Sequence, residues 1–196
     1  MKLHAQANLF NAIKLAASGK TKYYGTVLML NDEIHTAREV TKTNAYHTDT
    51  FESPQLGILG YIDENNISIY RANSRALLTA DKWATPFDLT KIKSSDMPKV
   101  EIAYAYSGTG AGGVSKTMGE ARSKAIKENG VIFVSTTHTG SGSNYASSDG
   151  IIAGDNLNAA HARILLELAL SFSSDFNTIK GWFDTYGSGQ VTIADK

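Results

Sequence analysis

The chain has no cysteine among its 196 residues, so disulfide frameworks, thiolate zinc sites and thiol catalysis are all excluded. It also lacks an excess of charge, because 19 acidic and 19 basic residues give a formal net charge of zero. Neither sign forms a long run. Nucleic acid and anionic membrane surfaces are therefore not expected partners.

Long hydrophobic runs are lacking as well. No apolar stretch approaches the roughly 20 residues that a membrane-spanning helix needs. The first six residues, MKLHAQ, have no apolar core of the kind found in signal peptides, which leaves the cellular location undecided. A chain of this length buries roughly 70% of its unfolded surface and needs neither a disulfide nor a metal to fold.

The N-terminal part of the chain shows helix and strand patterns. Residues 8–18 carry apolar side chains at helical spacing, at positions 9, 10, 13, 16 and 17, and Gly19 is a typical stop. The apolar run 25–30 predicts a buried parallel strand, and the polar segment 31–56 predicts a loop. Segments 57–62 and 67–71 flank four turn-forming residues and predict a β-hairpin.

The C-terminal part alternates strand and helix. Residues 76–98 contain Pro86 and Pro98, show no strong periodicity and are interpreted as a linker, with a boundary near 95. After it, strands are predicted at 100–106, 131–134 and 150–153, and helices at 115–129, 159–170 and 174–186. Asn158 is the expected cap of the second helix, with Ile164, Leu165, Leu168 and Ala169 on its apolar face. This alternation predicts an α/β fold with a parallel sheet.

Lys42 is the most informative basic residue. It stands between Thr41 and Thr43, in a polar segment that follows the apolar run 27–30. A polar loop after a buried strand is a common place to present an amine to a small polar substrate. To move protons near neutral pH, the amine needs a pKa below its usual value of about 10.4 or a nearby acid. On spacing alone, a solvated surface lysine remains the favoured interpretation.

A glycine-rich turn carries Gly108, Gly110 and Gly113 in the spacing G-x-G-x-x-G, between a predicted strand and a predicted helix. Dinucleotide sites use this spacing to hold a pyrophosphate at the helix N-terminus. They also need a carboxylate about 20 residues later, at the end of the next strand. Here that strand ends in the sequence STTH at 135–138, so nucleotide binding is the weakest hypothesis.

The remaining candidate residues favour no other chemistry. The five histidines, His4, His35, His47, His138 and His161, lack metal-ligand spacing and are expected to be ordinary surface or partly buried residues. No G-x-S-x-G segment supports a serine hydrolase. The sequence HTDT at 47–50 looks like the T-D-T of amidohydrolase active sites, but FESP follows it instead of a helix start. We interpret it as a chance similarity in a loop.

Several long segments together resemble the bacterial and fungal L-asparaginases. They are NLFNA at 8–12, NDEIHTAREVTKTN at 31–44, LGYI at 59–62, PFD at 86–88, GAG at 110–112 and DNLNAAHARILL at 155–166. The similarity runs in register over nearly the whole chain. It implies the C-terminal part of an asparaginase N-terminal α/β domain at residues 1–94. It also implies a shortened flavodoxin-like C-terminal domain, with a parallel sheet, at residues 95–196.

The resemblance implies hydrolysis of L-asparagine to aspartate and ammonia without a cofactor. The family uses a threonine nucleophile in a T-G-G-T-I-A type segment, and a second threonine and an aspartate in H-G-T-D-T. Lys42 matches the lysine that holds this aspartate and helps to set the protonation of the second threonine. Lys42 is therefore the expected catalytic residue, and the family's tetramers imply a homo-oligomer.

The chain departs from the family pattern in several places. It has no T-G-G-T-I-A type segment, and we expect its first residue to correspond to a family position after both threonine motifs. Two family positions that reach a neighbouring subunit's site fall on Gly113 and near Ser143, where the usual carboxylate is missing. A helix and a strand of the family are missing between Tyr106 and Ser107.

Three hypotheses follow from the match and the departures. The first is an asparaginase-family chain with little or no turnover of its own, because the loss of a nucleophile removes most of the rate. The second is a non-catalytic subunit that pairs with a full-length asparaginase, through apolar surface left open where strands are missing. The third is the weak nucleotide-binding hypothesis.

Overall fold

The chain forms two compact units, Met1–Thr85 with Gly189–Lys196, and Pro86–Ser188. The computed structural model describes residues 2–78, 84–104 and 115–191. The domain boundary predicted near 95 lies further along the chain than this division, inside the second unit.

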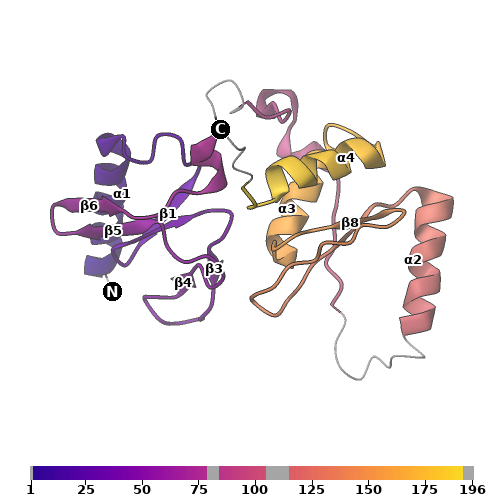
Figure 1. Cartoon of the computed structure of the whole chain (residues 1–196), viewed down its shortest axis with the longest axis horizontal. Helices are drawn as coiled ribbons and strands as arrows, with labels where there is room; N and C mark the ends of the chain where they lie inside the picture. The colour runs from indigo at the N-terminus through magenta and orange to yellow at the C-terminus, as the bar shows by residue number, and fades with distance from the viewer. Residues whose placement is uncertain (1, 79–83, 105–114, 192–196) are drawn as a thin grey trace. The chain divides into compact units, whose positions relative to one another are not determined.

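The first unit is built on a four-stranded sheet in the order β1-β2-β5-β6 (Figure 1). Its strands are β1 (Val27–Leu30), β2 (Glu33–Thr36), β5 (Gly60–Asp63) and β6 (Asn66–Ile69). Every neighbouring pair in it is antiparallel. The hairpin predicted at 57–71 is confirmed as β5 and β6. At Gly60 an added Cβ would lie 1.9 Å from the Ser68 carbonyl oxygen, so only glycine fits there.

Two expectations for the region before this hairpin are wrong. The run 25–30 does not form a parallel strand, because β1 pairs antiparallel with β2. The segment 31–56 is not one loop, because it contains β2 and the short strands β3 (Thr41–Lys42) and β4 (Phe51–Glu52). The physical reason is the turn at Asn31 and Asp32, whose φ angles of 52° and 63° are those of a tight hairpin turn.

Helix α1 (Lys2–Ser18) lies on one face of the four-stranded sheet (Figure 1). Its buried contact is Leu15, which is 1% exposed and packs with Met29, Ile34 and Ile62 from the strands and with Leu59 just before β5. Two lysines, one within α1 and one just after it, connect this helix to the β5–β6 hairpin. Lys14 Nζ donates to the Glu64 carbonyl oxygen at 2.7 Å, and Lys20 Nζ donates to that of Ile67. As predicted, Gly19 ends the helix, with a φ of 69°.

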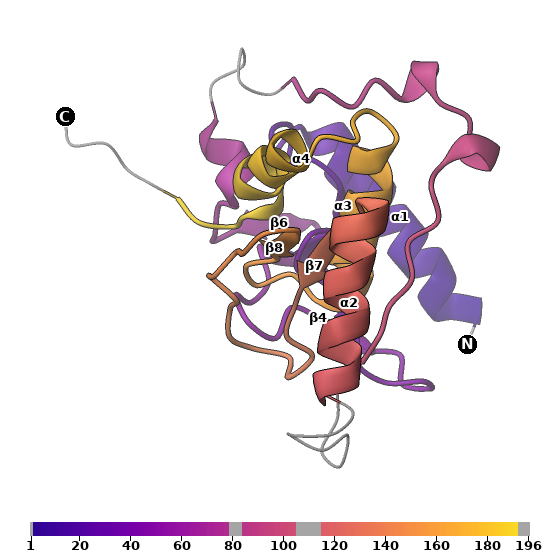
Figure 2. The ribbon, with the colours of Figure 1, turned by 90° about the vertical axis from the view of Figure 1, so that its right-hand side faces the viewer.

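The second unit has a parallel strand pair, as predicted, formed by β7 (Phe133–Ser135) and β8 (Ile151–Ala153). Helix α2 (Ser115–Asn129) stands in front of this pair in Figure 2 and reaches Gly150 through Ile126. On the other side of the pair lie α3 (Ala159–Leu170) and α4 (Phe176–Trp182), followed by the turn η6 (Phe183–Gly187). This mixture of helices with a parallel pair confirms the α/β class.

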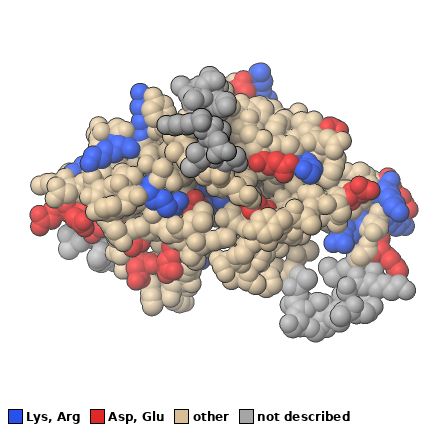
Figure 3. All heavy atoms as spheres, in the orientation of Figure 1, with Lys and Arg blue, Asp and Glu red and all other residues tan. Residues whose placement is uncertain are grey.

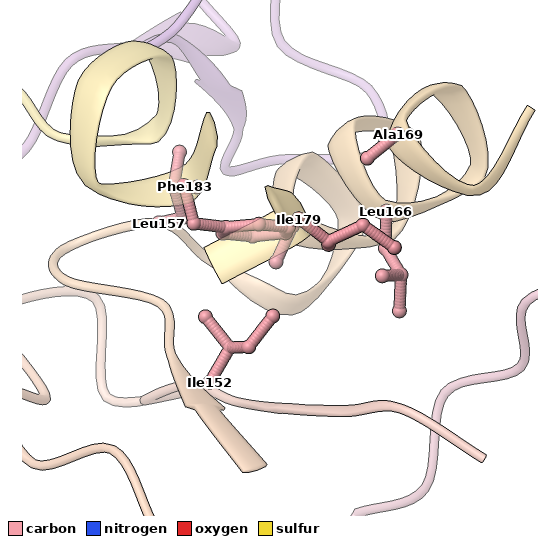
Figure 4. Close-up of a cluster of buried hydrophobic side chains, with 7 residues drawn as sticks. Ile152, Leu157, Leu166, Ala169, Ile179 and Phe183 are labelled. Carbon is pink, nitrogen blue, oxygen red and sulfur yellow. The ribbon is translucent and has the colours of Figure 1, made fainter. Parts of the chain in front are cut away.

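The core of the second unit lies between β8 and the helices α3 and α4 (Figure 4). Its fully buried members are Ile152, Leu157, Ala162, Leu166, Ala169, Ile179 and Phe183. Asn158 caps α3 as predicted, because its side chain accepts the backbone N–H of His161 at 2.9 Å. The predicted apolar face of α3 is partly wrong, since Ile164 is 59% exposed while Leu166 is buried.

The linker region docks onto this second core. Phe87 contacts the rings of Phe172, Trp182 and Tyr186, with centroids 5.7, 5.2 and 5.8 Å away. Short 3₁₀ turns follow at Leu89–Lys91 and Ser94–Asp96. The strand predicted at 100–106 does not form over 100–104, and residues 105 and 106 lie outside the described part. No helix in that part is long and apolar enough to cross a membrane.

Candidate active site

Lys42 sits on a two-stranded ribbon of the first unit, made of β3 and β4. In the antiparallel register Lys42 lies opposite Phe51, and Thr41 lies opposite Glu52. Because side chains alternate across a strand, Lys42 and Phe51 share one face of the ribbon and Thr41 and Glu52 share the other. The Lys42 side chain is exposed, and among the described residues none forms a hydrogen bond or ion pair with its amine.

Side-chain hydrogen bonds hold the ribbon and its connecting loop. The Thr43 hydroxyl donates toward the Thr50 carbonyl oxygen and a Glu52 carboxylate oxygen, each 3.0 Å away. The Asn44 backbone N–H donates to the Thr50 hydroxyl at 3.0 Å, and that hydroxyl donates back to the Asn44 carbonyl oxygen. The Asn44 side chain accepts the N–H groups of Tyr46 and His47. These bonds fix the residue next to Lys42 and close the loop that follows.

A buried histidine fastens the sheet to the segment that follows β4. His35 is 0% exposed, and its Nδ1 lies 3.0 Å from the Ser53 hydroxyl, with which it shares a hydrogen bond. Its Nε2 lies 3.3 Å from a Glu33 carboxylate oxygen, without a well-formed hydrogen bond to any described residue. Burial lowers the pKa of His35 below 6.5, and the Glu33 and Glu52 carboxylates offset this only in part.

The position of His35 corrects the expectation that all five histidines are surface or partly buried residues. Because β2 alternates, Glu33 and His35 lie on the face of the sheet opposite Ile34, and on that face His35 is buried in contact with Ser53. The signal in the sequence was the turn at Asn31 and Asp32, which makes 33–36 a strand and not a loop. A second anchor was also missed. Arg71 donates to Glu39 Oε2 at 2.5 Å and to the Gly57 carbonyl oxygen at 2.6 Å.

The other candidate residues do not join Lys42. His47 and Asp49 are exposed in the loop between β3 and β4, with Nδ1 and Oδ1 3.8 Å apart. Gly108, Gly110 and Gly113 lie outside the described residues. Ser143 is half-buried in the second unit, next to the bridge between Asn144 and Asp155.

The reactive group on the ribbon is the Lys42 amine, and hydrogen bonds hold the backbone next to it in place. A lysine amine can pair with a carboxylate or, once deprotonated, accept a proton. Within 2–78, 84–104 and 115–191, no group of three or more histidine, aspartate or glutamate side chains is arranged to hold a metal ion. On the face shown in Figure 3, acidic and basic side chains are interspersed and form no large patch of one sign.

Comparison with known proteins gives matches to both halves of the chain. The family model described as asparaginase, N-terminal, matches residues 1–75. The model described as glutaminase/asparaginase C-terminal domain matches residues 103–183. Lys42 and its supporting hydrogen bonds lie in the first match, and the core of the second unit lies in the second.

Individual relatives agree with the family models. L-asparaginase 2 of Bacillus subtilis is 33% identical over 92% of this chain and 52% of its own length. L-asparaginase 2 of Escherichia coli is 32% identical over 91% of this chain and 57% of its own length. The crystal structure of a probable cytoplasmic L-asparaginase from Campylobacter jejuni superposes with a TM-score of 0.72 and 30% identity, over 92% of this chain and 63% of that one.

The chain thus spans little more than half the length of the curated relatives that it matches. The two family models nevertheless name the same family, as do the relatives near one-third identity and the solved structure with the shared fold. The chain belongs to the asparaginase family.

Proposed function

We propose that this chain is the Lys42-bearing part of an amidohydrolase that converts L-asparagine and water to L-aspartate and ammonia. The observation that carries the proposal is the position of Lys42, in a segment that matches the family and on a ribbon that Thr43, Asn44 and Thr50 hold in place. In this role Lys42 holds a catalytic carboxylate and sets the protonation of a hydroxyl nucleophile. The reaction needs no cofactor.

Alone, the chain is expected to show little or no turnover. The sequence has no T-G-G-T-I-A type segment, and the threonines near Lys42 are engaged in the backbone of its own loop. Without a nucleophile only binding and electrostatic contributions to the rate remain. The test is ammonia release from asparagine by the purified protein, with Lys93→Ala as an exposed-lysine control. Robust turnover that disappears in Lys42→Ala would overturn the expectation.

A second candidate function is that of a non-catalytic partner for a full-length asparaginase. The large apolar side chains that α1 leaves exposed favour it over a self-sufficient enzyme. Co-purification with an intact relative supports this candidate, whereas a well-behaved monomer that ignores the relative counts against it.

A further inference from the structure

The ribbon that carries Lys42 is attached to the four-stranded sheet at both its ends. At the β3 end, Val40 is 8% exposed, and its backbone N–H donates to the Thr36 carbonyl oxygen at 3.1 Å. At the β4 end, the Ser53 hydroxyl shares a hydrogen bond with His35 Nδ1, 3.0 Å away. The first attachment consists of backbone and apolar groups, which do not titrate. The second contains an imidazole, the side chain whose charge changes between pH 5 and 8.

The attachment at Ser53 is connected directly to the ribbon. Ser53 is 6% exposed and follows Glu52, the last residue of β4. The Thr43 hydroxyl donates to a Glu52 carboxylate oxygen at 3.0 Å, and the Thr43 N–H donates to the Thr50 carbonyl oxygen at 2.8 Å. A displacement of Ser53 from the sheet therefore disturbs the hydrogen bonds that hold Thr43, the residue next to Lys42.

The site around His35 suits a neutral imidazole and not a charged one. His35 is 0% exposed, and the Ser53 hydroxyl satisfies one of its two ring nitrogens. Protonation places hydrogens on both nitrogens, and Nε2 has no well-formed hydrogen bond among the described residues. Two carboxylates act on the ring, that of Glu33 on the same strand, 3.3 Å from Nε2, and that of Glu52 on β4. Burial outweighs both and lowers the pKa of His35, so the charged ring is more stable in water than in this site.

We propose that His35 and Ser53 form a proton-operated latch on the Lys42 ribbon. The latch is closed while the imidazole is neutral. Acidification opens it, because a segment that moves away from the sheet lets water reach the ring, and the hydrated ring binds a proton. Helix α1 and the sheet stay folded in the open state, since their buried cluster does not include His35. His35 is thus a positioning residue for Lys42, and this consequence alone rests on the proposed function.

The test is backbone hydrogen exchange of the full chain at pH 7.5 and pH 5.5, with each rate divided by that of an unstructured amide at the same pH. The reporter is the Thr43 N–H of the ribbon, and the reference is the Leu59 N–H, which donates to the Ile34 carbonyl oxygen at 2.7 Å. Exchange at Thr43 should report local opening, with a weaker dependence on low urea concentrations than exchange at Leu59. Equal urea dependence at both amides would overturn the proposal, since the ribbon and the sheet would then open as one unit.

Protonation should drive the opening of the ribbon. Because an exposed histidine has a pKa of about 6.5, the protection of Thr43 should fall by up to about tenfold between pH 7.5 and 5.5. In His35→Asn a side-chain amide, which does not titrate, takes the place of Nδ1 and can still bond to Ser53. The protection of Thr43 should then no longer depend on pH. A pH dependence that persists in this variant contradicts the proposal, as does its absence in the unchanged chain.

The matched control is His47→Asn, because His47 belongs to the loop between β3 and β4 and its side chain is 70% exposed. The pH dependence of exchange at Thr43 should remain in this variant. Its loss would assign the titration to His47 and overturn the latch at His35.

A second variant leaves the titrating ring in place. Ser53→Ala removes the hydroxyl that bonds to Nδ1 and should lower the protection of Thr43 at pH 7.5 by about fivefold, as expected for the loss of one net hydrogen bond. Unchanged protection would show that this bond does not hold the ribbon, and the proposal would then be wrong.

Hydrogen exchange needs no turnover, so this test and the ammonia assay have separate outcomes. A ribbon that opens with acid through His35 supports the latch even in a chain that releases no ammonia. Lys42-dependent ammonia release by a chain whose ribbon opening does not change with pH keeps the proposed function and overturns the latch.

Discussion

Helices α1 and α3 cover the sheets of their own units in different ways. Within the described residues both units have buried clusters of similar size, with six buried residues in the cluster that includes Leu15 of α1 and seven in the cluster that includes α3. Helix α3 is covered further by α4, whose Ile179 is 0% exposed, and Phe183, just after it, is 2% exposed. The outer side of α1 has no such cover among the described residues. The difference between the units therefore lies in the second layer and not in the inner core.

This contrast explains why one half of the chain resembles a closed domain and the other an open one. The second unit encloses Leu166 and Ala169 between its strands and α4. The first unit gains its inner contact from Leu15 but leaves three large side chains of the same helix in water. These side chains, Leu9, Phe10 and Ile13, form the outer face of α1 and are already about one-third buried, so full burial would gain each of them roughly 1–2 kcal/mol.

The largest expected effect comes from the inner cores. Ile179→Ala and Ile34→Ala should each lower the free energy of unfolding by about 2–5 kcal/mol, because both side chains are fully buried and alanine leaves a cavity. Urea unfolding followed by circular dichroism checks this, with Ile164→Ala as the exposed control. A loss of under about 0.5 kcal/mol at Ile179 would show that the second unit is not closed as described.

The next prediction concerns the pH dependence of the first unit. Burial lowers the folded-state pKa of His35, so the unfolded chain binds a proton more readily than the folded chain below about pH 6.5. The stability that neutral His35 contributes is present above about pH 6.5 and is lost as the pH falls below this value, towards the lowered pKa of the folded state. His35→Gln should flatten the corresponding slope of urea midpoint against pH between 7 and 5. An unchanged slope would mean that the imidazole does not titrate differently on folding.

A smaller effect is expected at the start of α3. Asn158→Ala should cost about 1 kcal/mol of unfolding free energy, because its side chain caps the backbone N–H of His161. Asn129→Ala, at the exposed end of α2, is the control and should change stability by less than about 0.5 kcal/mol. Equal effects at the two asparagines would argue against the cap.

The smallest effect is expected on the outer face of α1. Ile13→Ser should change the unfolding free energy of the chain by only about 0.5 kcal/mol, because Ile13 is 62% exposed. Leu15→Ala, two positions further on the inner side, should cost about 2–5 kcal/mol. Comparable losses at both positions would show that the chain covers both sides of α1.

Much of the fold could be predicted from local signals. The hairpin at 57–71, the stop at Gly19 and the cap at Asn158 each depend on residues that lie close together in sequence. The parallel pair β7–β8 was indicated by apolar strand-length runs that alternate with helices. Strands β2, β3 and β4 were missed because they are only two to four residues long and polar. The pairing of β2 with β1 depends on the turn at Asn31 and Asp32, whereas β3 and β4 pair with each other in a separate ribbon.

Of the candidate site, the sequence predicted Lys42 but not the hydrogen bonds that hold the segments near it. The resemblance identified Lys42, but spacing alone did not reveal the supports around it. The bond between His35 and Ser53 joins residues 18 positions apart, and that between Arg71 and Glu39 joins residues 32 apart, so both depend on tertiary packing. The apolar stripe of α1 was recognised as helical, but the sequence pattern could not show which side the sheet would cover.

The most direct test of this account is the solvent accessibility of isoleucine methyl groups in the isolated chain. A soluble gadolinium chelate broadens methyl resonances that water can reach and spares those in a core. We expect strong broadening for Ile13, at 62% exposure, and little for Ile179, at 0%. Equal protection of Ile13 and Ile179 in the chain alone would contradict the claim that the outer face of α1 is open.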